Sequence, residues 1–97
     1  MRLLLSPAAQ SDMSDIWDFT AERWGEDQAE RYTQRLRGTL TELAAGRRTS
    51  RSAEDVAPGY RKCLAGSHIA YFRIAASDLI IIRILHQSMD PETQFRT

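Results

Sequence analysis

The sequence predicts a single α+β domain in the order strand, helix, helix, strand, strand, strand. Three features predict it. A short apolar run comes first, then two segments whose apolar residues recur about every 3.6 positions, then three segments in which apolar residues alternate with others. With 97 residues the chain has the length of one domain, so we expect residues 1–97 to form one folding unit.

The first strand and the first helix are predicted from the N-terminal segment. Leu3–Leu5 is the apolar run, and Ser6 and Pro7 follow it as a helix cap and a first helical residue, where the missing proline N–H is not needed. Gly25 is expected to end the helix, because glycine readily adopts the left-handed conformation. The stripe expected to face the core comprises Ala9, Met13, Ile16, Trp17, Thr20 and Trp24.

A second helix is expected to run from Glu26 to about Ala45 and to return against the first as an antiparallel hairpin, because the connection at Gly25 is short. Its predicted inward stripe comprises Ala29, Tyr32, Leu36, Leu40 and Leu43. Residues 46–59 are polar and rich in turn formers, so we expect a surface loop there.

Three strands are predicted at Tyr60–Leu64, His68–Ala75 and Leu79–His86, as an antiparallel meander. The last strand is apolar on both faces, which indicates an internal strand, and Leu3–Leu5 is its available second neighbour. Strict alternation in that strand would place Ile80, Ile82, Ile84 and His86 on one face and Leu79, Ile81, Arg83 and Leu85 on the other.

The sheet is expected to end near His86 or Gln87, because the alternation stops after Leu85 and Pro91 cannot donate a strand hydrogen bond. Residues 88–97 are then a tail. Two roles are open for the tail: a contact surface for a target, or packing of Met89 over an edge of the sheet.

Thirteen acidic and thirteen basic residues give zero formal charge, which argues against a dedicated nucleic-acid-binding domain. The charges are unevenly placed, with a net −5 over residues 1–30 and a net +6 over residues 31–73. Arginine supplies most of the positive charge and suits a partner that is an acidic peptide or a phosphate backbone. A single cysteine, no apolar run long enough for a signal peptide and none long enough to cross a bilayer indicate a cytoplasmic protein without a membrane span.

The amino-acid sequence of particular segments resembles that of the ParE branch of the RelE/ParE toxin superfamily. The similarity covers nearly the whole chain and is most specific at its ending. The segments that carry it are Leu5-Ser6-Pro7-Ala8-Ala9 with Asp12, Ile16-Trp17, Phe19-Thr20, Trp24-Gly25, Gln28-Ala29 with Tyr32, Pro58-Gly59-Tyr60-Arg61, Gly66-Ser67-His68, Tyr71-Phe72-Arg73 and Ile84-Leu85-His86-Gln87-Ser88-Met89-Asp90.

This resemblance implies a two-layer domain in which the helical hairpin packs on an antiparallel sheet, with the first strand beside the last. It also implies a toxin of a type II toxin–antitoxin system whose target is DNA gyrase. A ParD-like antitoxin would neutralise it by wrapping it with a C-terminal segment. DNA would be reached only through the antitoxin.

Partner contacts are predicted at two places. The family-specific ending predicts target contacts at His86, Gln87, Met89 and Asp90. The basic middle of the chain predicts antitoxin contacts at Arg31, Arg35, Arg61, Arg73 and Arg83. The spacing of Trp17, Trp24 and Tyr32 favours core packing, although aromatic residues also anchor partners; loss of a buried Trp17 side chain would cost about 3–5 kcal/mol.

An enzyme of the RelE kind, which cleaves ribosome-bound mRNA, is the alternative function. Such a site would need a base, an acid and cations, which could come from His68, His86, Arg61, Arg73 and Arg83. Structural roles compete: hydrogen bonds from the histidines to backbone, and an ion pair from Arg83 to an acid such as Asp15. The sequence has no metal-ligand spacing, phosphate loop or nucleophile elbow, so we predict no catalytic residue, cofactor or metal.

Overall fold

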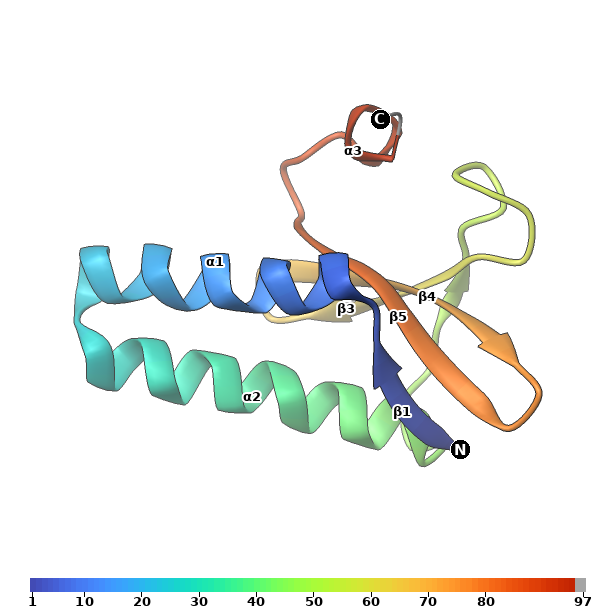
Figure 1. Ribbon diagram of the computed structural model, residues 1–97, viewed down its shortest axis with the longest axis horizontal. Helices are drawn as coiled ribbons and strands as arrows, with labels where there is room; N and C mark the ends of the chain where they lie inside the picture. The colour runs from blue at the N-terminus through green and yellow to red at the C-terminus, as the bar shows by residue number, and fades with distance from the viewer. Residues whose placement is uncertain (96–97) are drawn as a thin grey trace.

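A computed structural model describes residues 1–95 (Figure 1). The predicted order of strand, two helices and three strands is confirmed, and each predicted end lies within one residue of the observed one. The structure adds a two-residue strand and a short C-terminal helix. The elements are β1 (Arg2–Leu5), α1 (Pro7–Trp24), α2 (Glu26–Ala44), β2 (Arg51–Ser52), β3 (Arg61–Ala65), β4 (His68–Ala75), β5 (Asp78–His86) and α3 (Pro91–Gln94).

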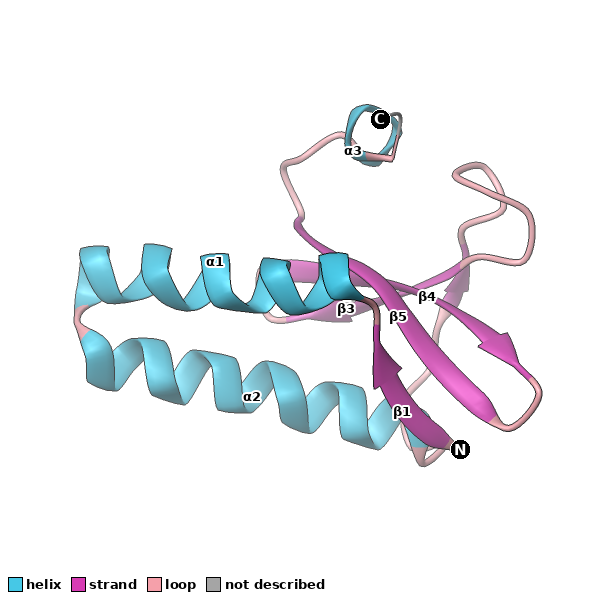
Figure 2. Cartoon of the chain, viewed as in Figure 1, coloured by secondary structure: helices cyan, strands magenta, loops and turns pink. Residues whose placement is uncertain are grey.

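The helices α1 and α2 form the expected antiparallel hairpin, which lies against one face of the sheet (Figure 2). Ser6 caps α1 by accepting the Ala9 N–H at 3.0 Å, and Gly25 turns the chain at a φ of 91°. Ala9, Met13, Ile16 and Thr20 are buried on α1, as their stripe predicts.

The two tryptophans are not core residues. Trp24 is 65% exposed, because the tip of the hairpin extends beyond the sheet and no strand covers it (Figure 1). Trp17 is half-buried in a hollow between the helices, beside Glu30 and Arg37, rather than between helix and sheet. The placement of Trp24 in the core was therefore wrong, and the large cost expected for truncating a fully buried Trp17 does not apply.

The five strands form one sheet in the order β1-β5-β4-β3-β2. The first strand lies beside the last, as predicted, with Leu3 opposite Leu79 and Leu5 opposite Ile81. This pair is parallel and the others are antiparallel, so the sheet is mixed rather than antiparallel. The long connection from β1 to β5 allows the parallel arrangement, which a tight turn could not.

A β-bulge in β5 changes which side chains face the helices. Phe72 pairs with Ile81 and Tyr71 with Arg83, so Ile82 is the extra residue. An extra residue reverses the alternation beyond it. Ile84 therefore joins the core on the helix side, together with Leu79 and Ile81, while Leu85 faces the other side. Strict alternation along β5 was wrong, and the bulge turns His86 toward the helices.

The face of the sheet opposite the hairpin carries a second, smaller core. Tyr71 and Leu85 are buried there with Ala53 from the 46–59 loop, so this loop packs on the sheet. Phe95, which follows α3, covers them with its ring centroid 5.4 Å from that of Tyr71. The part of the tail that packs is thus Phe95 and not Met89; residues 96 and 97 lie outside the described residues.

A polar clamp joins α1 to β5 where β1 ends. Asp12 accepts hydrogen bonds from Arg83 Nε at 2.8 Å, from Arg83 Nη2 at 2.9 Å and from the Ile84 N–H at 2.8 Å. Arg83 Nη1 also donates to the Gln94 carbonyl at 3.3 Å, which ties in the tail. The carboxylate of Asp12 raises the pKa of Arg83. The expected partner, Asp15, is exposed one turn further along α1.

None of the helices in residues 1–95 has the length and apolar character that crossing a membrane requires.

Candidate functional site

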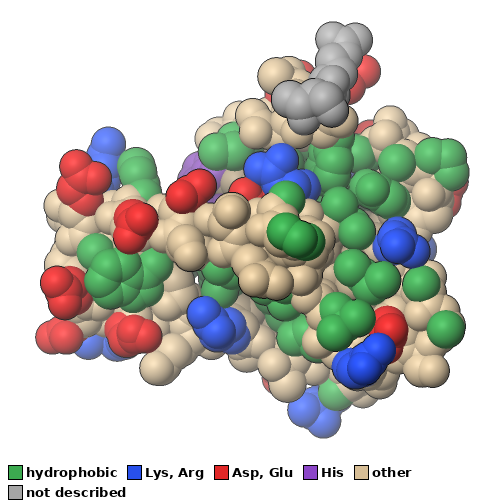
Figure 3. Space-filling model, in the orientation of Figure 1, with side chains coloured by type: hydrophobic (Ala, Val, Ile, Leu, Met, Phe, Trp, Pro, Cys, Tyr) green, Lys and Arg blue, Asp and Glu red, His purple; other side chains and the backbone are tan. Residues whose placement is uncertain are grey.

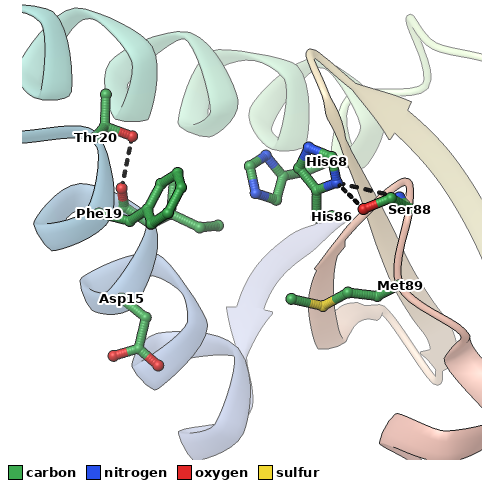
Figure 4. A pocket seen from close by; sticks show the side chains of 8 residues that line it. Asp15, Phe19, Thr20, His68, His86, Ser88 and Met89 are labelled. Carbon is green, nitrogen blue, oxygen red and sulfur yellow. Dashed lines mark hydrogen bonds between the residues drawn. The ribbon is translucent and has the colours of Figure 1, made fainter. Parts of the chain in front are cut away.

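A groove opens between α1 and the turn that follows β5, which we call the α1–tail groove. Its volume is about 500 Å³. Side chains from α1 form one wall, and the histidines at the start of β4 and the end of β5 form the other, with Met89 at the rim (Figure 4). The lining residues are Asp15, Ile16, Phe19, Thr20, His68, His86, Ser88 and Met89.

Two large apolar side chains stand exposed at this groove. Phe19 is 54% exposed and Met89 47% exposed, and both face the same space (Figure 4). The Arg23 guanidinium lies 4.8 Å from the centroid of the Phe19 ring, on which it stacks. Exposed apolar groups that converge on one recess are typical of a binding surface, whereas single exposed apolar residues are ordinary.

A hydrogen-bond chain fixes the histidine wall of the groove. The Ser67 N–H donates to the Tyr32 hydroxyl at 2.9 Å, and that hydroxyl is hydrogen-bonded to His68 Nδ1 at 2.7 Å. The Ser88 N–H donates to His86 Nδ1 at 3.1 Å, and the Ser88 Oγ lies 2.7 Å from the same atom. The two rings meet edge to face, 5.3 Å between centroids. Because the His86 Nδ1 accepts from the Ser88 N–H, the Nε2 atom of His86 carries a proton.

Gly66 leaves room for this chain of hydrogen bonds. Its φ is 60°, and a Cβ there would lie 2.8 Å from the Tyr32 hydroxyl oxygen. We expect Gly66→Ala to lower the free energy of unfolding by roughly 1–3 kcal/mol, through left-handed backbone strain and displacement of Tyr32. Urea unfolding measures this. Gly59→Ala is the matched control, because its φ of 81° is also left-handed and nothing lies within 4 Å of its added Cβ; an equal loss in both variants would contradict the steric argument.

The stability of the fold should depend on pH through His68. Burial, and secondly the neighbouring His86, lowers its pKa from 6.5 to about 4. Between these values the unfolded chain binds a proton that the folded chain does not, so stability falls as pH falls from 6.5 toward 4. Allowing for partial exposure, we expect a loss of about 1–2 kcal/mol. Urea unfolding at pH 7 and pH 5 should show it, and His68→Gln should remove it; an unchanged dependence would contradict this assignment.

The predicted target residues are only partly gathered here. His86 and Met89 line the groove. Gln87 is exposed beside it, with its N–H bonded to the Ser67 carbonyl at 2.9 Å. Asp90 caps α3 by accepting the Glu92 N–H at 3.1 Å. The exposed Phe19, which belongs to no core stripe of α1, is the signal in the sequence that the site includes this helix.

The predicted antitoxin residues do not form one surface. Arg31 and Arg35 are exposed one turn apart on α2. Arg61 donates to Ser50 Oγ at 2.8 Å, and Arg83 belongs to the clamp with Asp12. Arg73 is exposed on the sheet face opposite the hairpin, because it follows Tyr71 by two residues.

Arg35 and three further basic residues gather around β3 beside the apolar Leu64. We call this set the β3-edge surface: Arg35, Arg48, Arg51, Lys62 and Leu64. Leu64 is 62% exposed and lies between two hollows that share Arg48. The short β2 pairs only with Arg61 and Lys62, so within residues 1–95 no strand pairs with the outer edge of the rest of β3. Acidic side chains crowd the tip of the hairpin, on the left of Figure 3.

The residues considered for RNA cleavage do not all converge, although the His68 and His86 rings meet. His68 and His86 face the helices, while Arg73 lies on the other side of the sheet. His86 does bond to backbone, as the structural role predicts, but His68 bonds to a side chain instead. Within residues 1–95, no group of three His, Cys, Asp or Glu side chains could hold a metal ion.

Comparison with known proteins identifies the family. Residues 3–91 match the family described as "ParE toxin of type II toxin-antitoxin system, parDE". The chain is 47% identical over 90 residues to Toxin ParE1 of Mycobacterium tuberculosis, with 92% of each chain covered. It is 38% identical over 86 residues to Toxin ParE1 of Caulobacter vibrioides, which covers 89% of this chain and 88% of that one.

A solved structure shares the fold. It is described as "Chromosomal ParDE TA system from P. aeruginosa" and superposes with a TM-score of 0.78 at 24% identity, covering 89% of this chain and 95% of that chain. The resemblance seen in the sequence is therefore confirmed. With a family match over most of its length and two close relatives, the chain belongs to the ParE family of toxins of type II toxin–antitoxin systems.

Proposed function

We propose that this ParE toxin inhibits DNA gyrase by direct protein binding, in the cytoplasm, and is neutralised by a ParD-like antitoxin. The α1–tail groove carries the proposal, because it is an apolar recess with exposed Phe19 and Met89 at its walls. Interfaces draw much of their affinity from such central apolar contacts. The family-specific ending of the chain contributes His86 and Met89 to the same recess.

A non-enzymatic action is supported by the contacts of the residues that RNA cleavage would need. The Nδ1 atoms of His68 and His86 are occupied by Tyr32 and Ser88. The Arg83 guanidinium is paired with Asp12 and that of Arg61 with Ser50. RNA cleavage would require a base, an acid and a cation within hydrogen-bond reach of one phosphate, and these side chains are instead engaged with other partners.

Two assays on the purified protein and on expressing cells test this proposal. We expect the toxin to inhibit DNA supercoiling by gyrase, and its expression to induce a DNA-damage response while transcripts stay intact. Primer extension measures transcript integrity. Cleaved mRNA without gyrase inhibition would favour the RelE-like alternative. Antitoxin binding without any effect on growth would instead indicate a degenerate toxin.

The antitoxin is proposed to place an acidic, amphipathic segment on the β3-edge surface and on the adjoining face of α2 with Arg31. Arg35 and Arg48 line a hollow beside Leu64, so positive charge and an exposed apolar side chain occur together. The open edge of β3 also offers backbone hydrogen-bond groups. DNA would be bound through the antitoxin, since the toxin has no net positive charge.

Association with the antitoxin should be steered by these charges. We expect Arg35→Glu to slow association roughly tenfold at low salt, and the wild-type rate to fall as salt rises, because screening acts beyond about 8–10 Å near physiological ionic strength. Stopped-flow mixing measures the rate. Arg37→Glu is the matched control: it makes the same charge change two residues along α2, where the side chain lines the hollow with Trp17. A rate that is independent of salt would remove the electrostatic argument.

A further inference from the structure

We propose that the α1–tail groove receives a basic, apolar segment of the target protein. In this arrangement an apolar side chain inserts between Phe19 and Met89, and a lysine or arginine lies against Asp15. The inference rests on the proposed function and adds the chemistry of the bound segment. It also separates the target site from the antitoxin site by charge.

The apolar part of the groove suits one inserted side chain. Its floor includes Ile16, which is buried, and its walls include the exposed Phe19 and Met89. The volume of about 500 Å³ falls within the range of roughly 300–1,000 Å³ that is typical of ligand pockets. An unbranched methionine adapts its shape to an incoming group, and an aromatic ring provides a large rigid contact.

The charge around the groove selects a basic segment. Asp15 lines the groove and Glu22 is exposed on the same face of α1, four residues before and three residues after Phe19. Asp12 is neutralised by Arg83, so it does not add to this charge. Arg23 is the nearby cation, and it stacks on the Phe19 ring.

An acidic segment would meet repulsion here, whereas the β3-edge surface would attract it. The histidine wall adds a hydrogen-bond donor. His86 accepts at Nδ1, which leaves its Nε2–H to donate to a carbonyl group of the bound segment. The groove therefore combines a carboxylate, an N–H donor and an apolar floor.

Two substitutions test the apolar and the charged parts of this proposal, and each has a control on the same helix. Phe19→Ala is matched by Trp24→Ala, an exposed aromatic at the hairpin tip. Asp15→Lys is matched by Asp18→Lys, whose carboxylate lines the hollow with Trp17. Each variant is measured for melting temperature, antitoxin affinity, gyrase affinity and toxicity on induced expression.

We expect Phe19→Ala and Asp15→Lys to weaken gyrase binding roughly tenfold or more and to reduce toxicity, with melting and antitoxin affinity unchanged. The two controls should stay within about twofold of the wild type in every measurement. Tenfold is the change expected when about 1.4 kcal/mol of binding energy is lost.

Other outcomes would overturn the inference. If both groove variants keep wild-type gyrase affinity and toxicity, the groove is not the target site. If they lose antitoxin binding but remain toxic, the groove belongs to the antitoxin. If the wild-type protein is toxic without binding gyrase, the proposed function fails, and the toxicity of the variants relative to their controls still decides whether the groove binds the actual target.

Discussion

Replacing Asp12 with alanine should lower the free energy of unfolding by about 3 kcal/mol, which for a domain of this size is a fall of roughly 12–20 °C in melting temperature. The substitution removes the acceptor of three hydrogen bonds, two from Arg83 and one from the Ile84 N–H. The arginine, with 23% of its side chain exposed, is then left without its counter-charge. Thermal melting and urea unfolding measure the loss.

Asp78→Ala is the control for Asp12→Ala. It also removes an arginine–carboxylate pair that joins β5 to another element, but Arg2, its partner, is 71% exposed. Solvent screens such a pair, so a much smaller shift is expected. Replacing both Asp12 and Arg83 by apolar residues should recover part of the stability, because no unpaired charge remains. Equal losses for Asp12→Ala and Asp78→Ala would show that the clamp is no stronger than a surface ion pair.

A chain that ends after Gln87 should lose about 2–4 kcal/mol of stability, because it lacks the Phe95 ring that covers Tyr71 and Tyr60 and the Gln94 carbonyl that Arg83 binds. It should also lose toxicity, because Met89 is removed from the α1–tail groove. Melting, antitoxin titration and a growth assay on this truncation measure both effects.

Two point substitutions separate these roles of the tail. Phe95→Ala should destabilise the fold and leave the groove intact, whereas Met89→Ala should reduce toxicity and leave melting unchanged. If the truncated chain has the melting temperature of the full chain, the tail has no role in stability and serves only as a contact surface. A truncated chain that remains fully toxic would contradict both roles.

The helices and strands were predictable because each has a local signature. Ser6-Pro7 marks the start of α1 and Gly25 its end, and the change from a 3.6-residue to a two-residue period marks the sheet. The bulge at Ile82 has no such signature, because β5 is apolar on both faces and an extra residue leaves its pattern unchanged. The position of His86 could not be predicted without it.

The candidate site was predicted only in part, because it is assembled from distant segments. His86 and Met89 come from the ending that the resemblance marked, but Phe19 and His68 reach the groove through the packing of α1 and β4, and His68 is held by Tyr32 of α2. The sequence could not show that Arg83 pairs with Asp12 and not with Asp15, because this contact also joins segments that are distant in the sequence. Both carboxylates lie on the acidic side of α1. Which of them meets β5 depends on where β1 ends beside β5, because that position sets where α1 begins.

The pairing of β1 with β5 also bears on how the chain is made. The first strand to be synthesised finds its neighbour only in residues 78–81, and Ser6 bonds to Ile82 across 76 positions. Pairing over such a separation is slow, because the entropic cost of closing the loop arises before the contacts that offset it can form. α1 depends on the same strand through Asp12 and Ile84. We therefore expect the nascent chain to remain unfolded through most of its translation, so that the toxin becomes active only after release from the ribosome, when antitoxin can already meet it.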